Sequence, residues 1–399
     1  LLAIPALLPF GSAVEVPILI AAVLGLRALW RGEVDPRAAG PRLALVLFAA
    51  YWGTETLSAF DAIAPRKSWT EVAADLRFAP LLLFACVALR DARRVRLAQI
   101  GVGVLVGLWC ADALLQATTG VSLGGAARGD RLSGIFGDDN LKLGGVMAAF
   151  APIALGVAWE RGGARIAALA AIPIGVVVLL AGARAAWVVL AVGLTLLLWH
   201  RLGLRRGAIA LGLAALMAVL AGAVSYAVSP RFAERVDRTA AALGGDPAAI
   251  DHALSGRLPI WKTAVAMGAA HPINGVGVRG FRYAYPAHAA PDDPWLEGDT
   301  GALHAHQILL ELWSETGLLG LLCWILGIGF ALRCWRDAPR VERALAVPPG
   351  IALVAVLFPL NTHYAVYSTF WSVGVFVLVA WWVGALQLAL DSRSRLSPD

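Results

Sequence analysis

Two histidines and two glutamates stand at the start of a long apolar run, in the stretch HAHQILLELWSETGLLG (residues 304–320). An imidazole can take a proton from an attacking hydroxyl group near neutral pH, which makes His306 a candidate general base. On a helix beginning at residue 304, His304, Glu311 and Glu315 would share one face, and His306 would project about 200° away from His304. The positive end of the helix macrodipole disfavours protonation, so a histidine there stays neutral and can accept a proton. The alternative is a histidine that is merely solvated.

Arg184 is the only charged residue between Ile166 and Trp199. An arginine in such an apolar stretch either reaches lipid headgroups or faces an internal polar cavity. The guanidinium fork binds phosphate oxygens through paired, charge-assisted hydrogen bonds. We therefore interpret Arg184 as an anion-binding residue, with the headgroup contact as the alternative.

Nearby acidic residues also have structural explanations. A glutamate near a helix N-terminus is stabilised by the macrodipole by about 0.3–1 kcal/mol, so Glu315 is either structural or part of a site. Asp138 and Asp139 follow the glycine-rich stretch GVSLGGAARGDRLSGIFG and precede an apolar run, where either would N-cap the helix. Asp139, His304 and Glu315 remain candidate substrate-binding residues.

The composition is that of an integral membrane protein. The chain has 399 residues, of which 59% are hydrophobic and only 15% charged, and its mean hydropathy is +0.72. Apolar runs long enough to cross a bilayer predict an all-α polytopic fold with about 12 transmembrane helices. The runs are residues 1–10, 14–30, 41–60, 71–90, 97–118, 141–159, 166–182, 185–199, 207–228, 304–332, 344–363 and 366–390. Residues 166–199 would form a helix of about 51 Å, too long for one crossing, so we expect two antiparallel helices turning at 182–184.

Arginine clusters occur in every second connection between these runs and at the C-terminus. The positive-inside rule places those connections and both termini in the cytoplasm. The expected organisation is helices 1–9 in 1–228, an outer loop in 229–303, helices 10–12 in 304–390 and a cytoplasmic tail in 391–399. The net charge of +6 then reflects topology, and we expect no nucleic-acid partner. The four cysteines lack metal-like spacing, and the first run lacks a signal-peptide cleavage site.

The outer loop is basic although positive-inside topology does not require it. It contains aromatics, prolines and apolar clusters, so we expect it to fold against the membrane. Its basic residues are Arg231, Arg235, Arg238, Arg257, Lys262, Arg279 and Arg282. The first three recur at helical spacing and are either a solvated or headgroup-facing stripe, or contacts for substrate phosphates.

Three stretches together resemble the O-antigen ligase and polymerase superfamily. SGRLPIWKTAVAMGAAHPINGVGVRGF (255–281) is similar to its S-G-R-x-x-x-W and H-P-x-x-G-x-G-x-x-x-F signature. Residues 304–320 resemble its next block, H-N-x-x-L-E-x-x-x-E-T-G-x-x-G, and GARAAWVVL (182–190) resembles an earlier S-R-x-x-x span. GIFGDDNLKLGG matches a further motif only loosely. Gln307 stands where the family often has Asn, and Ala183 where Ser is common.

The resemblance implies a GT-C-like fold and a glycosyltransferase. It implies transfer of a finished glycan from undecaprenyl diphosphate to lipid A-core oligosaccharide at the periplasmic face of the bacterial inner membrane. Arg184, Arg257 and His306 correspond to the family's functional arginines and histidine, and we expect Lys262 and Arg279 to assist in substrate binding. No D-x-D motif occurs in an outward segment, so we expect no metal or other cofactor.

Other functions remain open at this point. An O-antigen polymerase would use a second lipid-linked glycan as acceptor, and a protein O-oligosaccharyltransferase would use serine or threonine. A lipid-linked glycan flippase is an alternative of another class, in which charges within the membrane mark a substrate pathway.

Overall fold

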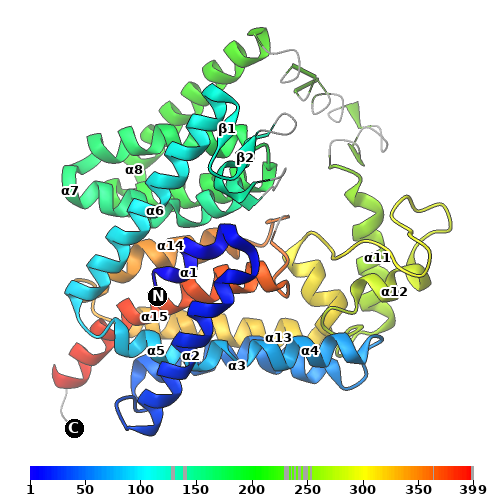
Figure 1. Ribbon diagram of the computed structural model, residues 1–399, viewed down its shortest axis with the longest axis horizontal. Coiled ribbons are helices and arrows are strands. Elements are labelled where there is room, and N and C mark those ends of the chain that lie inside the picture. The colour runs from blue at the N-terminus through cyan, green and yellow to red at the C-terminus, as the bar shows by residue number, and fades with distance from the viewer. Residues whose placement is uncertain are drawn as a thin grey trace.

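A computed structural model describes residues 1–126, 131–137, 142–228, 254–362 and 364–396, and single residues or pairs within 233–251. Almost all of its regular structure is helical (Figure 1). The α-helices are α1 (Ala3–Leu7), α2 (Glu15–Trp30), α3 (Ala39–Ala59), α4 (Pro65–Asp75), α5 (Phe78–Ala88), α6 (Ala92–Thr119), α7 (Lys142–Leu180), α8 (Arg184–Val228), α11 (Arg257–Ala270), α12 (Phe281–His288), α13 (Ile308–Asp337), α14 (Val347–Val356) and α15 (Thr369–Leu396). The 3₁₀ helices among the described residues are η1 (Leu8–Val14), η2 (Gly134–Phe136) and η4 (Glu342–Ala346), and a hairpin pairs β1 (Val121–Ser122) with β2 (Gly125–Ala126).

Within the described residues, six helical stretches are long and apolar enough to cross a membrane. They are Ala3–Trp30, Ala92–Thr119, Lys142–Leu180, Arg184–Leu216, Ile308–Asp337 and Thr369–Ser392. The chain is therefore a multi-pass, all-α membrane protein, whereas twelve crossings stay a prediction. Two predicted runs take a different form: 71–90 is divided between α4 and α5, and the described part of 344–363 contains the end of η4 and the ten-residue helix α14.

Glycines divide the longest helices into legs. Gly163 in α7 has φ +66° and Gly203 in α8 has φ +75°, a conformation that costs glycine little and other residues more. Both breaks lie in arginine-rich connections that the sequence predicts, between the runs 141–159 and 166–182 and between 185–199 and 207–228. These pairs of runs are therefore separate helical legs.

The C-terminal helix α15 lies at the centre of the bundle (Figure 1). It is the most enclosed of the apolar helices, with 89% of its most apolar window buried. The ring of Phe376 on α15 stacks on Phe78 of α5 at 4.2 Å and meets Tyr51 of α3 edge-on at 4.9 Å. Such aromatic pairs contribute about 0.5–1.5 kcal/mol beyond the burial of their area. Around this core α2 packs on α5, α13 on α3, α6 on α7 and α7 on α8.

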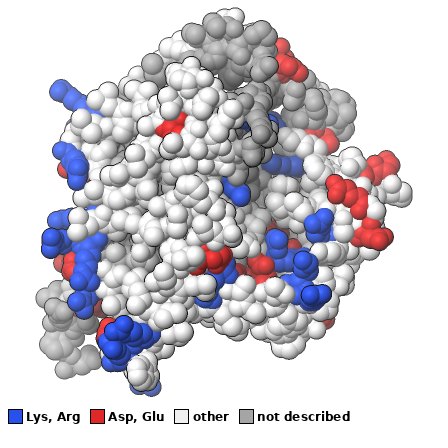
Figure 2. All heavy atoms as spheres, in the orientation of Figure 1, with Lys and Arg blue, Asp and Glu red and all other residues white. Residues whose placement is uncertain are grey.

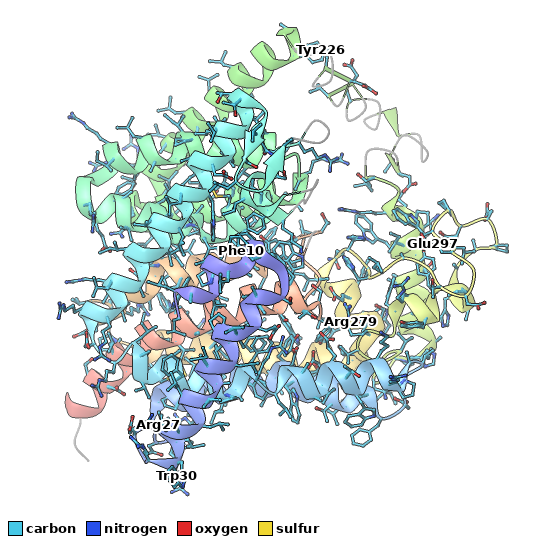
Figure 3. All side chains as sticks on the ribbon, viewed as in Figure 1. Phe10, Arg27, Trp30, Tyr226, Arg279 and Glu297 are labelled. Atoms are coloured by element: carbon cyan, nitrogen blue, oxygen red, sulfur yellow. The ribbon has the colours of Figure 1, made fainter. Side chains whose placement is uncertain are left out.

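Residues 254–303 form a small helical unit, here called the loop subdomain, with its own apolar core. This core joins α11, α12 and the approach to α13, and its members are Ile260, Ala264, Met267, Val276, Phe281, Ala284, Tyr285, Ala302 and Ala305. α11 also packs directly on α13. Lysine and arginine side chains gather along the opposite end of the bundle, near the end of α2 where Arg27 lies (Figures 2 and 3). Arg231, Arg235 and Arg238 lie outside the described residues.

Candidate active site

Arg184 is the first residue of α8 and follows a tight turn from α7. Gly182 adopts φ +73° in this turn, and the indole N–H of Trp187 donates to the carbonyl of Val178 across it at 3.1 Å. The prediction of two helices reversing at 182–184 is confirmed. The Arg184 guanidinium is exposed, and its Nη2 donates to the Ser255 hydroxyl at 2.7 Å. Arg184 therefore reaches the loop subdomain.

Arg257 begins α11, directly after the left-handed pair Ser255 and Gly256, which have φ +63° and +69°. The Asp251 carboxylate accepts from the N–H of Leu258 at 2.8 Å, satisfying a donor at the helix N-terminus. This turn brings Ser255 to Arg184 and leaves Arg257 half-buried beside it. The pKa of the Arg257 guanidinium lies below its ordinary value, first because burial disfavours the charge and second because Arg184 is positive.

The two histidines precede α13, which begins at Ile308 and not at residue 304 as predicted. Gln307 is the N-cap: its Oε1 accepts from the N–H of Leu310 at 2.6 Å, and its amide donates to the carbonyl of Pro359 at 2.7 Å. The predicted helical stripe therefore does not include His304. The rings of His304 and His306 lie 3.9 Å apart between centroids, so they do not point to opposite sides. The amide of Gln307 thus has a structural use.

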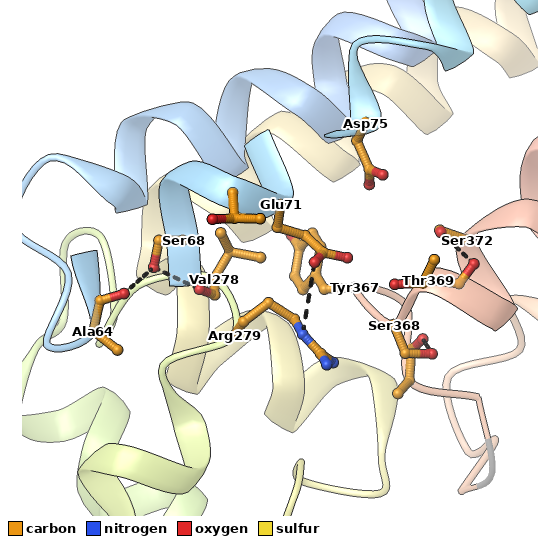
Figure 4. Close-up of polar contacts among 12 residues, drawn as sticks. Ala64, Ser68, Glu71, Asp75, Val278, Arg279, Tyr367, Ser368, Thr369 and Ser372 are labelled. Carbon is orange, nitrogen blue, oxygen red and sulfur yellow. Dashed lines mark hydrogen bonds and ion pairs between the residues drawn. The ribbon is translucent and has the colours of Figure 1, made fainter. Parts of the chain in front are cut away.

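Residues 272–281 run as a loop between α13 and the junction of α3 with α4. The N–H of Val276 donates to the carbonyl of Ser314 on α13 at 2.8 Å. On the other side the Ser68 hydroxyl donates to the carbonyl of Val278 at 2.6 Å (Figure 4). Hydrogen bonds to α13 on one side and to α4 on the other hold the loop in place. The H-P-x-x-G-x-G-x-x-x-F stretch thus has a structural role. Its residues 272–281, inserted between α13 and the start of α4, are here called the wedge.

Glycines permit this close approach. Gly275 and Gly317 have φ +69° and +62°, and each faces main-chain atoms of the other segment. A Cβ on Gly317 would lie 2.5 Å from the carbonyl oxygen of Ile273, and one on Gly275 would overlap the main chain of Glu315. Gly277 is equally confined, against Ala62. These glycines are required by contact as well as by φ.

Glu311 and Glu315 are buried, each 2% exposed, and lie one turn apart on α13. The Glu315 carboxylate accepts from the N–H groups of Arg279 and Phe281 at 3.1 and 3.3 Å. The Glu311 carboxylate accepts from those of residues 366 and 367 at 3.1 and 3.2 Å. The two glutamates of the L-E-x-x-x-E block thus each hold the main chain of a different segment that lies far away in the sequence.

Arg279 is where the wedge turns outward, with φ +60°. Its Nε lies 3.9 Å from the Glu71 carboxylate, and its side chain is 39% exposed. The side chain extends past Glu71 toward the start of α15, at the junction of the loop subdomain with the bundle (Figures 3 and 4). Arg279 therefore combines a main chain fixed by Glu315 with a guanidinium that solvent or a ligand can reach.

Three residues other than glycine have positive φ in the described part of the chain: Ser255, Arg279 and His306. Such conformations cost on the order of 1–3 kcal/mol and cluster at functional sites. All three lie in the stretches that carry the candidate site residues. The sequence did not predict this backbone strain, because positive φ is uncommon for every residue type except glycine and depends on tertiary contacts.

The structure says less about the two remaining predicted substrate-binding residues, Lys262 and Asp139. Lys262 is exposed on α11, five residues after Arg257, so the two side chains leave the helix about 140° apart. Asp139 lies outside the described residues. Within the described chain no group of three His, Cys, Asp or Glu side chains is arranged to hold a metal ion.

Packing relates His306 to the arginines. Ala305 is fully buried between the two histidines and shares the loop-subdomain core with Ile260, one turn along α11 from Arg257. Arg184 joins the same region through Ser255. The segment that carries the histidines thus packs on the core that supports α11, and Arg184 contacts the residue two positions before Arg257.

Sequence comparison agrees with this arrangement. Residues 166–325 match the family model described as O-antigen ligase, and this range contains Arg184, Arg257 and His306. No curated protein matches the chain. The matched range runs from the α7 leg before Arg184 to the middle of α13, and so includes the turn, the loop subdomain and both glutamates. Over residues 166–325 the chain is thus similar to the O-antigen ligase family, which supports a place in the O-antigen ligase and polymerase superfamily.

Proposed function

We propose that the protein transfers a glycan en bloc from undecaprenyl diphosphate to lipid A-core oligosaccharide, as an O-antigen ligase. The observation that carries the proposal is the hydrogen bond from Arg184 to Ser255, which holds two arginines from distant segments side by side. We place the site at the periplasmic face of the inner membrane, in a GT-C-like protein with both termini in the cytoplasm.

Two neighbouring guanidinium groups repel each other unless an anion lies between them. The pKa of Arg257 is lowered first by burial and then by the positive charge of Arg184. A diphosphate would relieve the repulsion and accept paired hydrogen bonds from both arginines. Hydrogen bonds to charged groups contribute about 1.5–3 kcal/mol each, so two arginines supply several kcal/mol toward expelling the carrier.

His306 is the proposed general base. A hydroxyl oxygen of the acceptor attacks the anomeric carbon, the bond from that carbon to the diphosphate oxygen breaks, and the hydroxyl proton passes to the imidazole. Displacement in one step inverts the anomeric centre. The backbone of His306 has positive φ, and the ring of His304 packs against its imidazole at 3.9 Å between centroids.

Other side chains have supporting roles in this proposal. Glu315 acts through the main chain of Arg279, whose exposed guanidinium contacts substrate. Lys262, His304 and Asp139 remain proposed substrate contacts. The polyprenyl tail enters from the side through the membrane, and the acidic acceptor approaches the basic loop subdomain. We propose no cofactor.

Reconstitution of the purified chain tests the reaction. The donor is undecaprenyl diphosphate carrying a glycan, supplied with lipid A-core, with a second donor molecule, or with an acceptor peptide. A new product with lipid A-core supports ligation. Product only with the second donor or only with the peptide makes the enzyme a polymerase or a protein O-oligosaccharyltransferase.

Movement of donor between leaflets without a new glycosidic bond would identify a flippase. Chelator in the same assay tests the absence of a metal. We expect an unchanged rate; loss that divalent ions restore would contradict the arginine-based mechanism.

A further inference from the structure

We infer that Arg131 is a third substrate-binding arginine of this site, and that it stabilises the diphosphate as it leaves. The inference rests on the proposed function. Arg131 lies outside the S-R-x-x-x, S-G-R and H-N blocks, in a stretch that matches the family signature only loosely. Its place in the structure carries the assignment.

The Arg131 side chain lies across the turn that presents Arg184. A Cβ on Gly182 would be 3.2 Å from Cγ and Cδ of Arg131 and 3.3 Å from its Nε. Gly182 is thus the residue over which the arginine stem passes. Since Gly182 and Arg184 are two residues apart, the Arg131 Nε lies within roughly 12 Å of the Arg184 Cα. Two long side chains can bind one diphosphate from that separation.

The segment that carries Arg131 is firmly held. The N–H of Leu132 donates to the carbonyl of Leu180 at the end of α7, 3.3 Å away. The buried Gln116 on α6 accepts from the N–H groups of Ser133 and Gly134 at 2.9 and 2.8 Å. Hydrogen bonds to two helices thus fix the main chain beside Arg131, while its side chain remains exposed. An exposed cation on a rigid support suits a ligand contact better than a mobile surface arginine would.

Charge counting explains why a third arginine is useful. In the donor, each phosphate of the bridging diphosphate carries one negative charge. When the bond to the sugar breaks, the bonding electrons stay with the diphosphate oxygen and the leaving group acquires a further negative charge. A guanidinium that meets this new charge stabilises the transition state more than the bound donor, which raises kcat. The Arg131 side chain lies against the turn that presents Arg184 and is placed for that role.

The test is binding of undecaprenyl diphosphate, and of undecaprenyl monophosphate, to the purified full chain in lipid nanodiscs. Arg131→Met keeps the stem that lies on Gly182 and removes the charge. We expect it to weaken diphosphate binding about 10-fold to 100-fold and to change monophosphate binding much less. Arg131→Lys, which keeps stem and charge, should fold like wild type and recover part of the affinity.

Arg333→Gln is the matched control, because it removes an arginine whose side chain is 81% exposed on the distant part of α13. It should bind like wild type. Wild-type affinity in Arg131→Met would overturn the role of Arg131 and leave the proposed function intact. Failure of the wild-type chain to bind undecaprenyl diphosphate would instead contradict the proposed function itself.

Discussion

Glu315 and Arg279 are joined through the main chain: the glutamate Oε2 accepts from the Arg279 N–H at 3.1 Å, while the guanidinium faces Glu71. The arginine is thus held in a left-handed conformation by a buried acid on another element. The main chain of Arg279 is thus held by one acid while its side chain faces another, and this arrangement makes the buried glutamates testable.

Glu315→Gln should reduce glycan transfer about 10-fold or more. The amide keeps one acceptor but turns an N–H donor toward a main-chain N–H, so one charge-assisted hydrogen bond of about 1.5–3 kcal/mol is lost. The measurement is the transfer rate in nanodiscs, with Glu342→Gln as an exposed control on η4. A Glu315→Gln enzyme as fast as wild type would show that this hydrogen bond does not position the site.

His306→Ala should lower transfer by about 10² to 10⁴, the contribution typical of a general base. Donor binding should be retained, since the arginines carry it. The measurement pairs turnover with binding of undecaprenyl diphosphate. His304→Ala is the comparison: the neighbouring ring orients the imidazole, so we expect a smaller loss. Normal product yield from His306→Ala would eliminate the base assignment.

Arg257→Lys separates paired hydrogen bonding from bare charge. Lysine keeps the charge but not the planar fork, so we expect transfer to fall about 10-fold. Ser255→Ala, which removes only the acceptor of the Arg184 hydrogen bond, should cost less, since a neutral partner contributes about 0.5–1.5 kcal/mol. Rates of both variants are compared under identical donor concentrations. Wild-type turnover by the lysine variant would show that Arg257 does not act through paired hydrogen bonds.

Gly317→Ala should prevent the wedge from docking on α13, because its Cβ would lie 2.5 Å from a carbonyl oxygen and its φ is +62°. The expected result is a lower melting temperature and protease cleavage within residues 272–281. Gly53→Ala is the control, a helical glycine on α3 with nothing within 4 Å of an added Cβ. Equal stability of the two variants would mean that the contact between α13 and residues 272–281 tolerates the added Cβ, and it would contradict this prediction.

The loop subdomain should lose stability in mild acid. The His288 ring lies 6.0 Å from His271, and the pKa of His288 is lowered by burial and then by the positive charge of His271. A histidine whose folded pKa is lowered binds fewer protons in the fold than in the unfolded chain. Stability is therefore lost as pH falls through about 6.5 and below.

Hydrogen exchange of α11 and α12, corrected for the intrinsic pH effect, measures this loss of stability. His288→Gln should flatten the pH dependence. A wild-type profile that does not change with pH, or one that the variant leaves unaltered, would contradict the prediction.

The sequence alone was sufficient for features that depend on local composition. Hydropathy and arginine spacing predicted the legs of α7 and α8, and the length of 166–199 required the turn at 182–184, because a helix has a fixed rise per residue. Motif residues identified Arg184, Arg257 and His306 as candidates. Hydropathy was less reliable at helix ends: residues 304–307 were assigned to a helix that begins at Ile308.

Only the tertiary structure decided which distant groups meet. Arg184 donates to Ser255, 71 residues away, and Glu311 accepts from residues 366 and 367, 55 and 56 residues away. Neither pairing leaves a periodic trace in the chain. A glutamate that binds main-chain N–H groups does not constrain which residues supply them, and an arginine can donate to any hydroxyl group that the fold brings near. Hydropathy records whether a residue meets lipid or water. Its partner is determined by how the helices pack, and for that reason Arg131 could be assigned only after the fold was known.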